Sequence, residues 1–120
     1  MSLDPPVVTL PVAPTATVVW SADVRRLGLC TLQVQNLDAT QVFSGFLQRK
    51  VGGELGWSTS AMPDFSAIQS AGSLDGDGNP LDAVTADVDV EGTAELRLVG
   101  RMSGAGGDVS VSVRTSGPKR

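Results

Sequence analysis

The sequence predicts an all-β protein, an antiparallel β-sandwich of either the immunoglobulin-like or the jelly-roll type. Apolar and polar residues alternate with a period of two along most of the 120 residues, which is typical of half-buried strands. Gly 14 and Pro 7 cluster between these runs and mark turns at regular spacing. A chain of this length is expected to form one domain, because larger chains are the ones that divide.

Residues 1–15 are expected to form an extended, proline-rich arm, ahead of a single sandwich domain over residues 16–120. Proline lacks the N–H group that helices and central strands need, so the segment is either an arm or an edge strand. Its apolar side chains are expected to bind a groove or a sheet edge, on this domain or on a neighbouring subunit. These partner-binding candidates are Val7, Val8, Leu10 and Val12.

Beyond Thr15 the period-two pattern predicts a succession of short strands, about eight with the arm included. They are expected near residues 18–22, 30–34, 43–47, 55–60, 84–90, 94–98 and 109–113. If the strands at 84–90 and 94–98 form a hairpin, the three-residue loop 91–93 sets their register. That register places the apolar residues of both strands on one face, whereas a two-residue loop would turn one strand outward.

Residues 63–72 interrupt the alternation and predict one short helical turn that closes an end of the core. Asp64 is a good N-cap residue, Phe65 and Ile68 have helical spacing, and Gly72 suits the position after a helix.

Composition excludes several functions. The chain has no His and a single Cys, so it lacks the residues for Ser-His-Asp catalysis, histidine bases and multi-cysteine zinc sites. Aromatic residues make up only 4% of the chain, which disfavours binding of sugars and of nucleic acids. Trp20 and Trp57 are expected in the core, and Cys30 is expected to be a buried thiol. We therefore expect no enzymatic activity and no binding to nucleic acid or membranes, which leaves protein–protein association.

One loop carries candidate metal ligands, at Asp75, Asp77 and Asn79. Oxygen side chains at alternate positions of a glycine-rich loop suit Ca²⁺, although the same residues also make an ordinary solvated turn. No other cofactor is expected. The second glycine-rich segment, residues 103–108, has no Lys and leads into a strand, so it is expected to be a hairpin connection rather than a phosphate cradle.

Charge is distributed unevenly along the chain. The net charge is −4, but residues 1–60 are neutral, residues 61–95 carry −8 and residues 96–120 carry +4. This pattern fits either a solvated acidic face or electrostatic complementarity between copies of the chain. In the second case the basic end, with Lys119 and Arg120, is expected to contribute to partner binding.

Three segments resemble small β-sandwich virion proteins of tailed bacteriophages, of the capsid decoration or cement type. They are residues 31–38 (TLQVQNLD), residues 63–65 (PDF) and residues 99–113 (VGRMSGAGGDVSVSV). The resemblance implies a non-enzymatic structural protein that binds and stabilises an assembled capsid lattice. It also implies partners such as the major capsid protein, and many copies or a homo-oligomer. It assigns no role to individual residues.

The expected location is therefore the virion, assembled in the host cytoplasm. Residues 1–6 lack the basic and apolar regions of a signal peptide, and no apolar run approaches the length of a membrane span. The alternative is a cell-surface or secreted immunoglobulin-like adhesion or accessory domain, which Ca²⁺ at residues 75–79 would stabilise.

Overall fold

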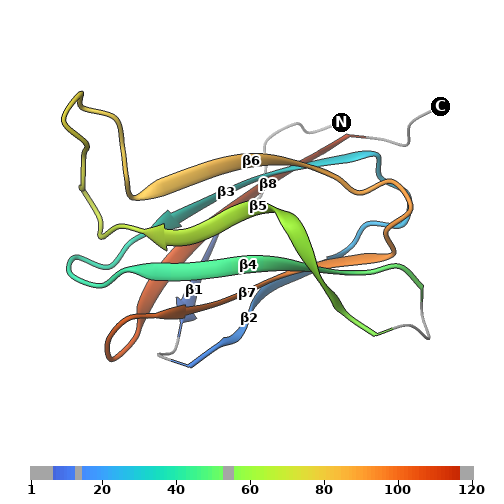
Figure 1. The fold of residues 1–120 in the computed structure, drawn as a ribbon, viewed down its shortest axis with the longest axis horizontal. Coiled ribbons are helices and arrows are strands. Elements are labelled where there is room, and N and C mark those ends of the chain that lie inside the picture. The colour runs from blue at the N-terminus through green and yellow to red at the C-terminus, as the bar shows by residue number, and fades with distance from the viewer. Residues whose placement is uncertain (1–6, 13–14, 53–55, 117–120) are drawn as a thin grey trace.

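The computed structural model describes residues 7–12, 15–52 and 56–116, and these form strands without a helix (Figure 1). The expected all-β architecture is confirmed. The strands are β1 (Val7–Val12), β2 (Thr17–Asp23), β3 (Leu29–Asn36), β4 (Phe43–Lys50), β5 (Ser58–Ile68), β6 (Ala83–Asp89), β7 (Glu95–Met102) and β8 (Gly107–Ser116).

The strands form two four-stranded antiparallel sheets with the order of a jelly roll. Sheet A has the order β1-β8-β3-β6, and sheet B has the order β2-β7-β4-β5. Strand β1 pairs with β8, β2 with β7, β3 with β6 and β4 with β5, as in one long hairpin that is folded over on itself. This is the double-sheet jelly-roll arrangement, and it differs from the strand order of the immunoglobulin fold.

The core lies between the two sheets, where the inward residues of each strand meet. Phe43 is fully buried, and its ring covers two glycines of sheet B, Gly45 and Gly100. A Cβ atom at Gly45 would lie 2.7 Å from that ring, and one at Gly100 would lie closer still. Cys30 is buried as expected, and desolvation raises the pKa of its thiol to about 11.

The expected helical turn at residues 63–72 is wrong, because β5 runs through this segment to Ile68. Residues i and i+3 of a regular strand face opposite sides, yet Phe65 and Ile68 are both buried. A β-bulge reconciles the two observations: Phe65 lies opposite Gly45 and Ile68 opposite Phe43, so β5 contains one extra residue. Ala67 in this bulge has a φ of 56°. The bulge therefore gives helical spacing to two core residues of a strand.

The hairpin considered for residues 84–90 and 94–98 does not form, since β6 belongs to sheet A and β7 to sheet B. The connection crosses from one sheet to the other. The N–H of Val90 donates to the carbonyl of Gly28 at 3.2 Å, and the N–H of Ala94 donates to that of Lys50 at 2.8 Å. An inward apolar face is required in either arrangement, so alternation alone does not distinguish a hairpin from a crossing.

The glycine-rich segment at residues 103–108 crosses between the sheets as well, from β7 to β8, rather than closing a hairpin. Gln41 fixes it. The amide Nε2 of Gln41 donates to the carbonyl of Gly106 at 2.6 Å, and its Oε1 accepts from the N–H of Gly104 at 2.8 Å. The segment is thus an ordered arch.

The apolar part of the N-terminal segment forms β1, an edge strand of sheet A in this chain. Val7 to Val12 pair with Ser112 to Gly107 of β8. The sequence left open whether this segment binds its own domain or a neighbouring subunit. In the structure it pairs with a sheet edge of its own domain. Residues 1–6 lie outside the described part of the chain.

Candidate partner-binding surfaces

The outer face of sheet B has an apolar centre. Strand alternation points Phe46 and Val99 outward, because Leu47 and Leu98 are buried between the sheets. Phe46 pairs with Val99, and Val99 pairs with Val18, so the three side chains form one row across the sheet. Phe46 and Val18 are 38% and 48% exposed, whereas Val99 between them is only 8% exposed. Apolar side chains that adjoin one another at outward positions form a patch, and such patches are typical of surfaces that bind another molecule.

A shallow depression of about 300 Å³ adjoins Phe46 on this face. It lies over the two core glycines, where only small residues and backbone separate the surface from the ring of Phe43. The residues that line it are Ala16, Ser44, Gly45, Phe46, Ser66, Gly100 and Arg101. The depression is almost wholly apolar, and a basic side chain, Arg101, stands at its rim.

Trp57 lies on the same face and not in the core as expected. It is half-buried, and the guanidinium of Arg97 stacks on its ring at 4.0 Å from the centroid. The ammonium of Lys50 lies 5.7 Å from the same centroid. Arg97 Nε also donates to Oε1 of Gln48 at 2.7 Å, which helps to hold the guanidinium over the indole. Tryptophan and arginine are the residues most enriched at the centres of protein interfaces.

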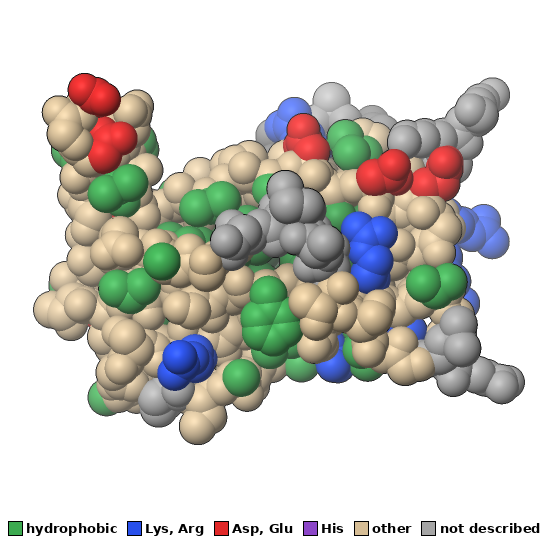
Figure 2. All heavy atoms as spheres, viewed as in Figure 1, with side chains coloured by type: hydrophobic (Ala, Val, Ile, Leu, Met, Phe, Trp, Pro, Cys, Tyr) green, Lys and Arg blue, Asp and Glu red, His purple; other side chains and the backbone are tan. Residues whose placement is uncertain are grey.

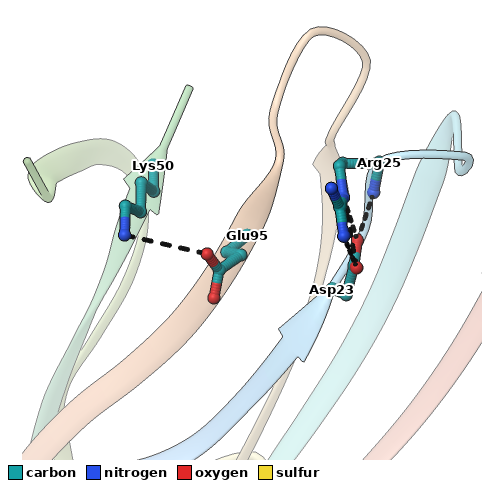
Figure 3. Close-up of polar contacts among 4 residues, drawn as sticks. All are labelled: Asp23, Arg25, Lys50 and Glu95. Carbon is teal, nitrogen blue, oxygen red and sulfur yellow. Dashed lines mark hydrogen bonds and ion pairs between the residues drawn. The ribbon is translucent and has the colours of Figure 1, made fainter. Parts of the chain in front are cut away.

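Together these residues define what we call the sheet B face: Val18, Phe46, Trp57, Arg97, Val99 and Arg101. Figure 2 shows the side of the molecule that carries β4 and β5, with hydrophobic side chains near its middle and basic groups toward both ends. Farther along β4, Lys50 makes an ion pair of 3.9 Å with Glu95 (Figure 3). The face is therefore apolar at its centre and mainly basic around it.

The outer face of sheet A is polar by contrast. Its outward positions include Thr31, Gln33, Thr85, Ser112 and Arg114. Thr31 Oγ1 donates to Oδ1 of Asp87 at 2.7 Å across β3 and β6. Short hydroxyl and amide side chains of this kind are well solvated, so the two faces of the sandwich differ in chemistry and sheet B carries the candidate surface.

A second candidate surface is the loop between β5 and β6, residues 69–82, which projects from one end of the sandwich (Figure 1). Leu74 pairs with Pro80 in an isolated bridge that closes the loop. Leu74 and Leu81 are 61% and 40% exposed. Acidic groups mark the tip of the loop in Figure 2. The loop thus combines exposed apolar side chains with negative charge.

The predicted calcium ligands form the tip of this loop. Asp75 Oδ1 accepts hydrogen bonds from the N–H groups of Asp77 at 2.8 Å and Asn79 at 2.9 Å. Asp75 Oδ2 accepts from Nδ2 of Asn79 at 3.1 Å, and these bonds hold the pKa of Asp75 below its usual value. The structure brings the three residues together, but through contacts within the loop. Within the described ranges no group of three or more His, Cys, Asp or Glu could hold a metal ion, and Ca²⁺ binding stays a prediction.

A buried amide anchors the base of the loop. Asn36 is fully buried, and its Nδ2 donates to the carbonyls of Gln41 at 2.8 Å and Ile68 at 3.2 Å. Its Oδ1 accepts from the N–H of Asp38 at 2.9 Å. The backbone N–H of Asn36 donates to the carbonyl of Asp82 at 2.8 Å, at the end of the loop. One residue of β3 therefore joins the end of β5, the start of β6 and the turn after β3.

The turn between β2 and β3 holds an exposed ion pair (Figure 3). Arg25 Nη2 lies 2.5 Å from Oδ2 of Asp23, and Arg25 Nε donates to both carboxylate oxygens. These hydrogen bonds lower the pKa of Asp23 to about 2. The pair fixes the turn, and it lies apart from the sheet B face.

The structure places the other predicted partner-binding residues only in part. Val7, Val8, Leu10 and Val12 lie on β1, with their backbones paired to β8. Lys119 and Arg120 lie outside the described residues. The sequence analysis missed Phe46, Trp57 and Arg101. The signal for Phe46 was its outward position beside the inward Phe43 and Leu47, and the signal for Arg101 was its position two residues after the outward Val99 on the same strand.

Comparison with known proteins identifies no family for this chain. No protein family matches the sequence, and no curated protein matches it. Among solved structures, the chain is similar to a chain in the structure of infectious bursal disease virus, Gt strain, with 13% identity and a TM-score of 0.41. The match covers 92% of this chain and 32% of that chain, so this chain spans about a third of its length.

Within the described part of the chain, no helix is long and apolar enough to cross a membrane.

Proposed function

We propose that this chain is a non-enzymatic structural protein of a bacteriophage virion, most concretely a decoration protein that binds and stabilises the assembled capsid lattice. The observation that carries the proposal is the combination of jelly-roll topology with one apolar, arginine-bearing outer face. Eight-stranded jelly rolls recur in viral capsids, although the same fold also serves lectins and cupins. The fold alone does not distinguish these functions, so the chemistry of the surface residues has to. The sheet B face has the apolar centre and the Trp and Arg residues of a protein interface.

The surface chemistry favours protein partners over small ligands. The depression beside Phe46 is shallow and apolar, and Trp57 is covered on one side by Arg97, so its ring is not an open platform for a sugar. The single thiol is buried with a raised pKa, which makes it a poor nucleophile. These features support binding through protein–protein contacts, with virion proteins such as the major capsid protein as partners.

The edge of sheet A supplies a second contact in this proposal. Strand β1 lies at the edge, and its outer backbone groups can pair with a strand of a neighbouring virion protein. Proline has no N–H group and is tolerated on an edge strand where its nitrogen faces away from the paired strand, as Pro11 does on β1. The residues two and four positions before Pro11 point their N–H groups to the same outer side. Thr9 is one of them, and Val7 is another.

Proteomic analysis of purified virions whose genome encodes this chain tests the proposal. The expected result is many copies per particle, together with lower thermal stability of particles that lack the protein, because a ligand of the assembled lattice stabilises it by mass action. Absence of the chain from purified particles would overturn the proposal.

Two variants test the edge contact in the same particles. Deletion of residues 1–14 should abolish incorporation, but it also removes β1 from sheet A. Thr9→Pro is the sharper variant, because it removes one outward N–H group and leaves the pairing with β8 in place. We expect Thr9→Pro to fold and to incorporate at least tenfold less, whereas Thr9→Ala should incorporate normally. Normal incorporation of Thr9→Pro would exclude strand addition at this edge.

A further inference from the structure

We propose that the sheet B face of one copy of this chain receives the β5–β6 loop of a second copy, with Leu74 in the depression beside Phe46 and Asp77 against Arg101. The proposal rests on the proposed function, in which many copies meet in one assembly, and names the partner of this face.

The two surfaces are complementary in charge. The loop, residues 69–82, carries three acids (Asp75, Asp77 and Asp82) and no base, whereas β7 presents Arg97 and Arg101 on the sheet B face. Arg97 is engaged by Trp57 and Gln48. No ion pair joins Arg101 or Asp77 to another residue in the described ranges, so both charges remain for a contact between copies.

The two surfaces are also complementary in polarity. Leu74 is the most exposed of the large hydrophobic side chains described, at 61%, and it stands beside the acidic tip. The depression of about 300 Å³ is large enough for one leucine side chain, and Arg101 lines its rim. Placing Leu74 in the depression brings Asp77, three residues along the loop, toward Arg101. In this arrangement Leu74 is buried in an apolar depression and Asp77 faces the opposite charge of Arg101.

The loop is already ordered for binding. The bridge between Leu74 and Pro80 closes its stem, and the carboxylate of Asp75 holds its tip through the N–H groups of Asp77 and Asn79. A preorganised loop loses little conformational entropy when it binds, so a small contact can still be favourable. Asp75 is occupied by these bonds, which leaves Asp77 as the carboxylate for the partner.

Sedimentation velocity of the purified full chain over a range of concentrations tests the contact. The expected result is concentration-dependent association that weakens as salt increases. Arg101→Glu and Asp77→Lys should each weaken association by at least about tenfold, because like charges then face each other. Arg114→Glu, the same charge change on the outer face of sheet A, is the matched control and should leave association unchanged.

Mixing the two variants separates a contact between copies from damage to the fold. Each variant alone places like charges together, but in a mixture Lys at position 77 meets Glu at position 101, and Asp77 meets Arg101. We expect the mixture to associate about as strongly as the unmodified chain. A chain that stays monomeric at every concentration, or a mixture that does not recover, would overturn the contact between copies.

These outcomes are distinct from those of the particle experiment. A monomeric chain that is nevertheless abundant in virions would leave the structural role intact and assign the sheet B face to a different virion protein. A chain that associates through this contact but is absent from virions would retain the contact and overturn the structural role.

Discussion

At the scale of single residues, Asn36 is a fully buried polar residue whose amide makes three hydrogen bonds to the backbone. It lies on a core strand, where alternation alone favours an apolar side chain, and its amide serves three backbone groups. A polar residue in an otherwise apolar strand pattern is a signal that the sequence offers. Two of its partners, Asp38 and Gln41, lie within five residues of it, but the third, Ile68, is 32 residues away, so no local pattern identifies the contact with β5.

Asn36→Ala is expected to lower the free energy of unfolding by about 3 kcal/mol, because it leaves the carbonyls of Gln41 and Ile68 buried without their donor. Urea denaturation monitored by tryptophan fluorescence measures this change. Gln33→Ala is the control: it removes an amide of similar size from the exposed face of the same strand, and its effect should stay within about 0.5 kcal/mol. Equal losses in both variants would contradict the role of the buried amide.

Asp23 provides a test of electrostatics at the same scale. Its pKa of about 2 is below the ordinary value of 3.8, mainly because of hydrogen bonds from Arg25. A lowered pKa in the folded state means that the carboxylate stabilises the fold above the unfolded pKa, near 4. This contribution is lost as the pH falls from about 4 through 2.

An NMR titration of the Asp23 carboxyl carbon measures that pKa directly. In Arg25→Gln it is expected to return toward 3.8, since the main hydrogen-bond donor is gone. Arg26→Gln should change it little, because Arg26 is the weakest of the groups that lower it. An unshifted pKa in the unmodified chain would show that the ion pair does not persist in solution.

At the scale of single elements, the bulge in β5 explains why the sequence predicts a helix where the structure has a strand. Phe65 and Ile68 both point into the core although they are three residues apart. A helical turn places residues with this spacing on one side, and so does a strand that contains one extra residue. Local signals such as an N-cap and a terminal glycine fit both arrangements. Only the pairing with β4, which is set by the whole sheet, decides between them.

Ala67→Gly is expected to stabilise the protein by about 0.5–1 kcal/mol, because Ala67 holds a positive φ that glycine adopts without strain. Thermal unfolding by circular dichroism measures the effect as a rise in Tm. Ala39→Gly, in an exposed turn without a positive φ, should lower Tm or leave it unchanged. A lower Tm for Ala67→Gly would mean that the bulge conformation differs from the one described.

The sheet B face also belongs to this scale. Strand positions followed from the alternation of residues, and the buried Phe43, Leu47 and Cys30 were predictable from it. Trp57 was not, because a tryptophan near a strand is usually core, and its partner Arg97 comes from β7, which is distant in the chain. Pairing of strands far apart in sequence builds the surface, so a single strand does not reveal it.

At the scale of the whole molecule, the fold class was predictable and the topology was not. Alternation and turns predict two sheets, but the same pattern fits a hairpin and an arch, as β6 and β7 show. The jelly-roll order depends on which sheet each strand joins. That choice is made by the packing of all eight strands together, which brings side by side strands that are far apart in the chain, such as β1 and β8.

The position of β8 has a consequence for how the chain is made. β8 lies between β1 and β3 in sheet A, so neither of these earlier strands can complete its pairing until residues 107–116 have been synthesised. Contacts between strands this far apart in sequence form slowly, and unpaired strand edges invite aggregation. Sheet A can therefore be completed only after β8 has left the ribosome. A nascent chain stalled before Gly107 would need a chaperone to keep its exposed edges soluble.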